Sequence, residues 1–407
     1  MSTVGRSDAE RAELGALIEL CSLPHMGPAR LRALLSSRDA LESIDQLRAG
    51  RAAVLTALRS CRGVDEQLIA TWRRQAALAF ERAAISGHPV GADLLAMHAR
   101  EGIWLSVPAR SDAAEIWESD PEPPALLFGQ GVAIDPEIRR VGVVGTRRCT
   151  AYGRTVAQQL GAGLAAAGVA VVSGLATGID GIAQRAALDA GGPVAGVVGS
   201  GLDQVYPASN RTLWADVARR GTLLSEYPLG RRAAHWQFPA RNRIVAALSE
   251  VLVVVESGTT GGSMYTVDAA AERDRPVMAV PGPITSAASA GANRLLADGC
   301  APVCEVADVL SALDAESPAR PACERSETER DARGRTVART AAAVAAGSQP
   351  DEPLDRQILD EFTAGPRTLD ELALQTGASL GELASALGRL QLSGWASETG
   401  GWWEKAR

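Results

Sequence analysis

A series of short apolar runs between Val141 and Pro283 constrains the fold of this chain most, because each run is apolar throughout instead of alternating with polar residues. Strands that are buried on both faces have this pattern, as in a parallel sheet covered by crossover helices. Alanine-rich segments of helical length separate most of the runs. We therefore predict a doubly wound, Rossmann-like α/β layer. Its strands are expected at 141–144, 169–172, 194–198, 222–224, 251–255 and 277–280.

The turns that follow these runs are rich in glycine, serine and proline, and they lie at the carboxyl edge of the predicted sheet. Ligands usually bind at this edge in doubly wound folds. Glycine lets the backbone approach a ligand, helix N-termini present amides to anions, and arginine forks fit phosphate oxygens. The sequence therefore predicts a site for a phosphate-bearing ligand. The candidate residues are Gly145, Thr146, Arg147, Ser173, Gly174, Gly178, Tyr206, Asn210, Arg241, Asn242, Arg243, Gly261, Gly262, Ser263 and Asn293.

The roles of these residues follow from their side chains. Phosphates are expected on Arg147, Arg241 and Arg243 and on the loop amides. Base contacts are expected from Asn242, Asn210 or Tyr206. Two alternatives stay open: the arginines at 241 and 243 can form salt bridges with neighbouring carboxylates, and a tyrosine before proline is as often simply packed.

Two common nucleotide-binding signatures are missing from these turns. The turn at 173–181 is neither GxGxxG nor a P-loop, because no Gly-Lys-Ser/Thr follows it.

The six cysteines are scattered, with one close pair at Cys300 and Cys304, and the four histidines are widely separated. We therefore predict reduced thiols, no metal site and no cofactor.

Charge argues for a local anion site instead of a broad basic face. The whole chain has a net charge of −7, but residues 140–313 carry 15 basic and 13 acidic residues. The negative net charge of the chain argues against a general nucleic-acid binder. The near-balance within residues 140–313 indicates that an anion would be held there by particular arginines.

The rest of the chain divides into four segments. Residues 1–90 are predicted to form an all-α, SAM/helix-hairpin-helix-like domain, in which residues 23–35 form either a phosphate-binding turn or an ordinary helical hairpin. Residues 91–124 would be a connector that contains a strand at 103–105, and the Rossmann-like domain would span 125–313, starting with a strand at 125–129. Residues 314–350, with alternating Glu and Arg, are expected to be a disordered linker.

Residues 351–407 are predicted to form a winged helix-turn-helix domain, with three helices followed by a two-stranded wing. The third helix, which would read DNA, contains one basic residue, Arg389, and the domain has 5 basic and 10 acidic residues. This charge favours a protein-contact or regulatory role over DNA reading.

Eight ordered motifs between about 125 and 313 resemble those of the DNA-processing protein A family (DprA, also called Smf). They are GTR with YG, SGxAxGIDxxA, GxGLDxxYP with a following Asn, SEYPxG, FPxRNRI, a GGS turn, PGP and GxNxLL. Weaker resemblance extends to the N-terminal helices and the C-terminal module. One departure is Gln184, which stands where the family usually has histidine after GIDxxA and which argues against a catalytic histidine.

The resemblance implies a protein that binds and protects single-stranded DNA, forms a homodimer through its Rossmann-like domain, and promotes loading of a RecA-type recombinase in recombination or natural transformation. Arg147, Arg241, Asn242 and Arg243 match the family's DNA pocket. No catalytic residue is implied.

An enzymatic alternative is a nucleotide phosphoribohydrolase of the lysine-decarboxylase-like group, with Asp180, Glu226 or Glu256 as acid or base. Its expected PGGxGTxxE fingerprint is missing, because the chain has Pro281-Gly282-Pro283 at the corresponding turn. A further alternative is a dinucleotide-dependent oxidoreductase, but the glycine motif that this class requires, GxGxxG, is also missing from the chain.

The N-terminus lacks a signal-peptide core and no run is long enough to span a membrane, so we expect a cytoplasmic protein.

Overall fold

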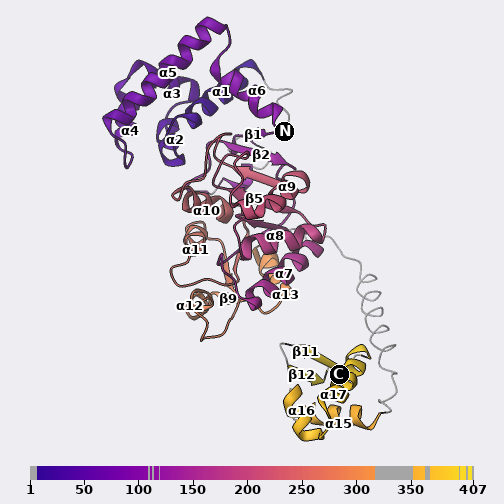
Figure 1. The fold of residues 1–407 in the computed structure, drawn as a ribbon. Helices are drawn as coiled ribbons and strands as arrows, with labels where there is room; N and C mark the ends of the chain where they lie inside the picture. The colour runs from indigo at the N-terminus through magenta and orange to yellow at the C-terminus, as the bar shows by residue number, and fades with distance from the viewer. Residues whose placement is uncertain are drawn as a thin grey trace, which may run out of the picture. The chain divides into compact units, whose positions relative to one another are not determined.

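The computed structural model describes residues 7–108, 111, 114–118, 120–316, 352–362, 367–393, 395–399 and 402–405 (Figure 1). The chain forms two compact units, Met1–Pro318 and Ala319–Arg407. Of the predicted linker, only 314–316 are described, as the end of a helix, and the remainder lies outside the described residues. None of the helices in the described ranges is long and apolar enough to cross a membrane.

Six helices make up the start of the first unit. Five of them lie in the segment predicted to be helical, whereas the sixth, at Val90–Arg100, lies in the segment predicted to be a connector. A capping box between Ser7 and Glu10 begins the first of them. The buried Trp72 fixes the hairpin that follows, since its indole Nε1 donates to the Pro24 carbonyl at 2.7 Å. The helices are α1 (Asp8–Ser22), α2 (Pro28–Leu35), α3 (Ala40–Ala49), α4 (Ala52–Arg59), α5 (Glu66–Ser86) and α6 (Val90–Arg100).

A nine-stranded sheet lies at the centre of the rest of this unit, in the order β1-β2-β6-β5-β4-β3-β7-β8-β9. From β3 onward the neighbouring strands are parallel, whereas β2 pairs antiparallel with both β1 and β6. The predicted mostly parallel, Rossmann-like sheet is therefore confirmed. The strands are β1 (Trp104–Ser106), β2 (Leu127–Gly131), β3 (Arg140–Val144), β4 (Ala170–Ser173), β5 (Val194–Val198), β6 (Thr222–Ser225), β7 (Val251–Val254), β8 (Val277–Ala279) and β9 (Ala301–Pro302).

Helices cover both faces of the sheet, which explains why its strands are apolar throughout. Val143 belongs to one buried cluster and Val144 to a second, on opposite faces. The first cluster packs under α7 (Ala151–Ala166), α8 (Ile179–Asp189), α9 (Arg211–Arg220) and α13 (Val306–Glu316) and continues into the N-terminal helices. The second packs under α10 (Gln237–Leu248), α11 (Met264–Ala271) and α12 (Ala290–Ala297).

The second unit has the predicted winged-helix layout. Its helices are α15 (Pro353–Glu361), α16 (Leu369–Thr376) and α17 (Leu380–Leu392), and its sheet has the order β10-β12-β11. The wing is the antiparallel pair β11 (Ala396–Thr399) and β12 (Trp402–Lys405), with β10 (Arg367–Thr368) beside β12. Ile358, Leu372 and Leu387 lie in its buried core.

Candidate nucleic-acid interface

The order of the strands creates a crevice at the carboxyl end of β3. From β3 the chain moves outward to β4, β5 and β6, and it then crosses back to place β7 on the other side of β3. Loops that leave adjacent strands in opposite directions open a ligand crevice at such a switch point. A cavity of about 330 Å³ lies there. Of the predicted residues, it is lined by Gly145, Thr146, Arg147, Gly174, Arg241, Asn242, Gly261, Gly262 and Ser263.

Arg147 is the exposed cation of this switch-point cavity. It follows β3, and its guanidinium carbon lies 5.3 Å from the centroid of the Phe238 ring. An arginine stacked on an aromatic face keeps its N–H donors directed sideways and open to an anion. The loop thus presents a positioned cation at the rim of the cavity.

Arg241 is the buried cation of the same cavity, with 5% of its surface exposed. Its Nη1 donates to the Val197 carbonyl, and among the described residues its Nε has no hydrogen-bond partner. Burial lowers the pKa of Arg241 to about 10, against the opposing effect of Asp180. Burial likewise raises the pKa of Asp180, whose carboxylate accepts from the Gly174 amide at 3.1 Å. A desolvated cation with a spare donor is prepared to bind an anion.

The glycine-rich turn after β7 forms the opposite wall of the cavity. The carboxylate of Glu256 fixes the start of this turn, because it accepts from the Thr150 amide at 2.9 Å and from the Thr150 hydroxyl at 2.6 Å. The Ser263 hydroxyl donates to the Ser257 hydroxyl at 2.7 Å, and Asn242 Nδ2 donates to the Gly262 carbonyl at 3.3 Å. Small residues leave the backbone of this wall accessible to a ligand.

Arg243 does not line the switch-point cavity beside Arg241. Two residues of an α-helix are about 200° apart, so the two side chains leave opposite faces of α10. Arg243 is buried and donates to the Glu226 carboxylate and, at 2.7 Å, to the Glu122 carbonyl. For Arg243 the structure therefore has the salt bridge that the sequence left open as an alternative.

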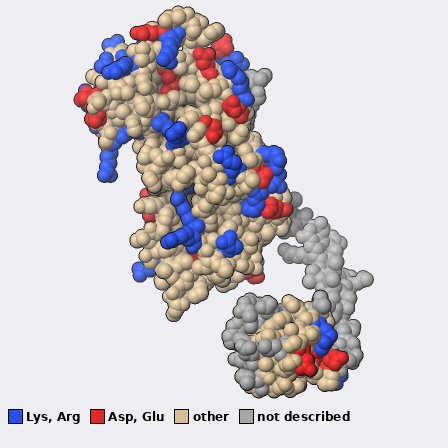
Figure 2. All heavy atoms as spheres, viewed as in Figure 1, with Lys and Arg blue, Asp and Glu red and all other residues tan. Residues whose placement is uncertain are grey.

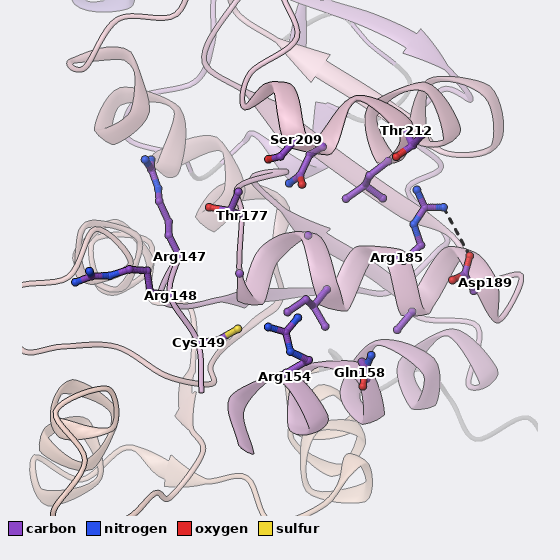
Figure 3. A pocket seen from close by; sticks show the side chains of 16 residues that line it. Arg147, Arg148, Cys149, Arg154, Gln158, Thr177, Arg185, Asp189, Ser209 and Thr212 are labelled. Carbon is purple, nitrogen blue, oxygen red and sulfur yellow. Dashed lines mark ion pairs between the residues drawn. The ribbon is translucent and has the colours of Figure 1, made fainter. Parts of the chain in front are cut away.

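A second arginine group lies next to the switch-point cavity, around a hollow of about 510 Å³ (Figure 3). Arg147 contributes to both cavities, and Arg148 and Arg154 line the second from the same loop and from the first turn of α7. Arg185 is held by Asp216 at 2.7 Å and by Asp189 at 3.7 Å. Sequence reasoning missed Arg148 and Arg154, although the Arg-Arg doublet and the first helical turn were signals that pointed to them.

The remaining predicted residues hold loops in place. The Ser173 hydroxyl donates to the Val143 carbonyl at 2.6 Å. Asn210 Nδ2 donates to the Leu175 and Ala176 carbonyls, both at 3.0 Å, and Asn210 and Gly178 line the second cavity. The Asn293 side chain bridges the amide and carbonyl of Gly282. Tyr206 is 43% exposed and packs at a tilt on Phe238, with the ring centroids 5.2 Å apart.

The candidate acid–base residues are engaged in structural contacts. Glu226 binds Arg243, Glu256 binds the start of α7, and Asp180 faces Arg241. Gln184, at the position where the family usually has histidine, is buried and connects the loop after β4 to strand β5, through the Leu175 amide (3.1 Å) and the Ala195 carbonyl (3.0 Å). No group of three or more residues able to hold a metal ion occurs in the described ranges.

Basic side chains on the visible face stand in small groups, several of them beside acidic side chains (Figure 2). On this face they do not merge into one continuous basic surface. An anionic ligand would therefore be held by a few particular arginines, as the near-balanced charge of the segment indicates.

Residues 108–314 match the family model of DNA recombination-mediator protein A, and residues 341–401 match that of the DprA winged helix domain. The chain is 38% identical to a putative DNA processing protein DprA of Mycobacterium tuberculosis, over 70% of this chain and 69% of that protein. It is 36% identical to DNA processing protein DprA of Bacillus subtilis, over 54% and 74%. The X-ray structure of DprA from Streptococcus pneumoniae superposes with a TM-score of 0.56 at 27% identity, covering 72% of this chain and 95% of that one.

Proposed function

The chain belongs to the DNA recombination-mediator protein A family, and on this premise we propose that it is a DNA-processing protein that binds single-stranded DNA in the switch-point cavity. The phosphates lie against Arg147, Arg241 and the glycine-rich turn after β7. The bases face the aromatic side chains at the rim of the cavity.

One observation carries the proposal: a buried arginine with a spare Nε donor and an exposed, ring-stacked arginine line the same crevice. Two cations held apart by the fold repel each other, and an anion between them relieves this cost. Successive phosphates of one strand supply such anions.

Aromatic side chains favour a single strand over a duplex. Phe238 and Tyr265 line the cavity, and Tyr265 is 57% exposed. Bases of a single strand can stack on such rings, whereas bases of a duplex are already stacked on one another. The combination of two arginines and two aromatic rings supports a single-stranded ligand.

A binding role without catalysis is supported by the engagement of Asp180, Glu226 and Glu256 in structural contacts. A hydrolase needs a carboxylate that is free to exchange a proton with substrate. No observation favours the phosphoribohydrolase alternative.

We further infer that the bound strand passes to a RecA-type recombinase, that two copies associate through the Rossmann-like layer, and that the protein acts in the cytoplasm. Membership of a recombination-mediator family supports the first inference. The acidic winged-helix module supports a protein contact outside the DNA-binding site, since acidic surfaces repel phosphates.

A salt titration of binding to labelled single- and double-stranded oligonucleotides, side by side, tests the proposal. We expect a clear preference for the single strand and an affinity that falls steeply with salt. No binding at low salt would overturn the proposal, and nucleoside monophosphates would then be screened for hydrolysis.

A further inference from the structure

A third cavity, of about 410 Å³, lies on the opposite side of α10 from the switch-point cavity. Its walls come from three parts of the unit: α2 with the turn before it, Glu122 in the segment before β2, and the first half of α10. Trp236, Ala240 and Arg243 contribute from α10 and its N-cap, and Gly27 and Arg32 contribute from the α2 side. We call it the α2–α10 cavity.

The side chain of Trp236 is held in place by its neighbours but remains exposed on the cavity side. Its indole meets the Tyr227 ring edge-on, with the centroids 6.0 Å apart, and a Cβ placed on Gly27 would lie 3.2 Å from the indole ring. The glycine thus lets the backbone before α2 pass against the ring. Nevertheless 47% of Trp236 is exposed. An indole that is held at one edge and open to a cavity can accept a second ring without losing much side-chain freedom.

The three arginines that line this cavity are engaged by other groups of the chain. Arg30 donates to the carbonyls of His25 at 2.6 Å and of Arg62 and Gly63 at 3.0 Å. Glu122 binds Arg32 at 2.8 Å, and Arg243 binds Glu226. Among the described residues that line this cavity, the Nη1 of Arg32 is a buried donor without a hydrogen-bond partner. A cavity whose arginines are already engaged by carboxylates and carbonyls, and which offers one spare donor and an open indole, is suited to a base.

The helix between the two cavities connects them. His235 and Phe238 line the switch-point cavity, and Trp236 lines the α2–α10 cavity. Phe238 lies in the first turn of α10, Trp236 is the N-cap of this helix, and His235 precedes it. A strand that leaves the first cavity over the N-terminal end of α10 reaches the second.

We propose that Trp236 stacks on a nucleobase of the same single strand, in the α2–α10 cavity, so that the N-terminal helices take part in binding DNA. The inference rests on the proposed function, because it needs a strand that is bound in the switch-point cavity. It gives the chain two kinds of contact, phosphates at the arginines and a base at the indole.

The test compares Trp236→Ala, Trp236→Phe and Arg147→Ala in the full chain, by equilibrium binding of labelled oligothymidylates of about 4 to about 16 nucleotides. Loss of one stacked base weakens binding about 5- to 150-fold. We expect Trp236→Ala to have this effect on the longer oligonucleotides and little effect on the shortest, with an unchanged salt slope because no phosphate contact is lost. Trp236→Phe, which keeps an aromatic ring, should have most of the wild-type affinity.

Phe80→Ala, which removes another exposed aromatic side chain (55% exposed) from α5, is the matched control and should bind as wild type does.

Oligonucleotides with an abasic site separate stacking from a change of fold. An abasic position that faces Trp236 should weaken wild type and leave Trp236→Ala unaffected, since the variant has already lost that contact. Equal weakening of both proteins at every position overturns the inference, as does wild-type affinity of Trp236→Ala for all lengths. If wild type binds no oligonucleotide, the proposed function itself fails. If wild type binds and only Arg147→Ala is weakened, the proposed function stands and the role of Trp236 falls.

Discussion

The guanidinium carbon of Arg147 lies 5.3 Å from the centroid of the Phe238 ring, although the two residues are 91 positions apart (238 − 147). The contact joins the loop after β3 to the first turn of α10, across the crevice at the sheet edge. It orders a long cation before any ligand arrives, so less side-chain entropy is lost on binding.

Arg147→Ala is expected to weaken binding of every single-stranded sequence by about tenfold or more, since a hydrogen-bonded charge contact is lost. The salt slope should fall by about 0.7 for one phosphate contact to a single strand. Titrations of several sequences at a series of salt concentrations measure both effects. Arg59→Ala, which removes a surface arginine of α4 that pairs with Glu66, is the control. A loss confined to one sequence, or an unchanged slope, would contradict the assignment of Arg147 to phosphates.

Arg243→Ala is expected to act on stability and not directly on a phosphate contact. The substitution leaves the Glu226 carboxylate buried without its partner, which costs about 3–5 kcal/mol of unfolding free energy. Urea denaturation measures this cost. The double variant Arg243→Met with Glu226→Gln should recover much of it, because no buried charge is then left alone. Wild-type stability of Arg243→Ala would show that the pair does not matter.

Part of this site could be predicted from the sequence and part could not, and α10 shows why. The motif Arg241-Asn242-Arg243 predicts a helix start near the carboxyl edge of the sheet, and α10 begins four residues before the motif, at Gln237. Which arginine faces the crevice depends on the angular position of the helix about its own axis, which tertiary packing fixes. The role of Arg148 and Arg154 depends on how α7 and α8 pack together, which again no local pattern contains.

Gly178→Ala is expected to destabilise the first unit. Gly178 has φ +80 and ψ −138, a conformation that is almost confined to glycine, and an added Cβ would overlap the Thr146 carbonyl. The expected cost is about 2 kcal/mol or more, from strain together with the overlap. Thermal or urea unfolding measures it, with Gly230→Ala as control, since Gly230 also has positive φ (+81) but nothing within 4 Å of its Cβ position. Equal losses in the two variants would assign the effect to φ alone.

Arg389→Ala in the winged-helix module is expected to leave the salt slope of DNA binding unchanged. The one basic residue of α17 is already bound to Asp355, at 2.6 Å and 3.2 Å, so it is not free to bind a phosphate. A reading helix that used Arg389 would lose about 0.7 from the slope on single strands. The Asp355 carboxylate, which is buried, would be left alone, so the module should become more sensitive to protease. Asp355→Asn with Arg389→Gln keeps the shape without the charges and serves as the control.

His98 should make the attachment of the N-terminal helices depend on pH. Its Nδ1 contacts the Leu94 carbonyl at 2.7 Å, and its Nε2 accepts from the Leu229 amide at 3.2 Å, across 131 residues. This arrangement requires a neutral ring with its proton on Nδ1. Burial lowers the pKa of His98 from its ordinary 6.5, against the raising effects of the Leu94 carbonyl and Asp203.

Since the folded protein holds fewer protons at His98 than the unfolded chain, stability rises with pH in this range. The contribution of His98 is complete above pH 6.5 and is lost as pH falls through the lowered pKa of the folded state. We therefore expect the stability difference between wild type and His98→Gln, which cannot be protonated there, to shrink as pH falls from neutral through this window. Urea unfolding of the two proteins at each pH measures it, and the other three histidines cancel because both proteins carry them. A difference that stays constant or grows on acidification would contradict the assigned tautomer.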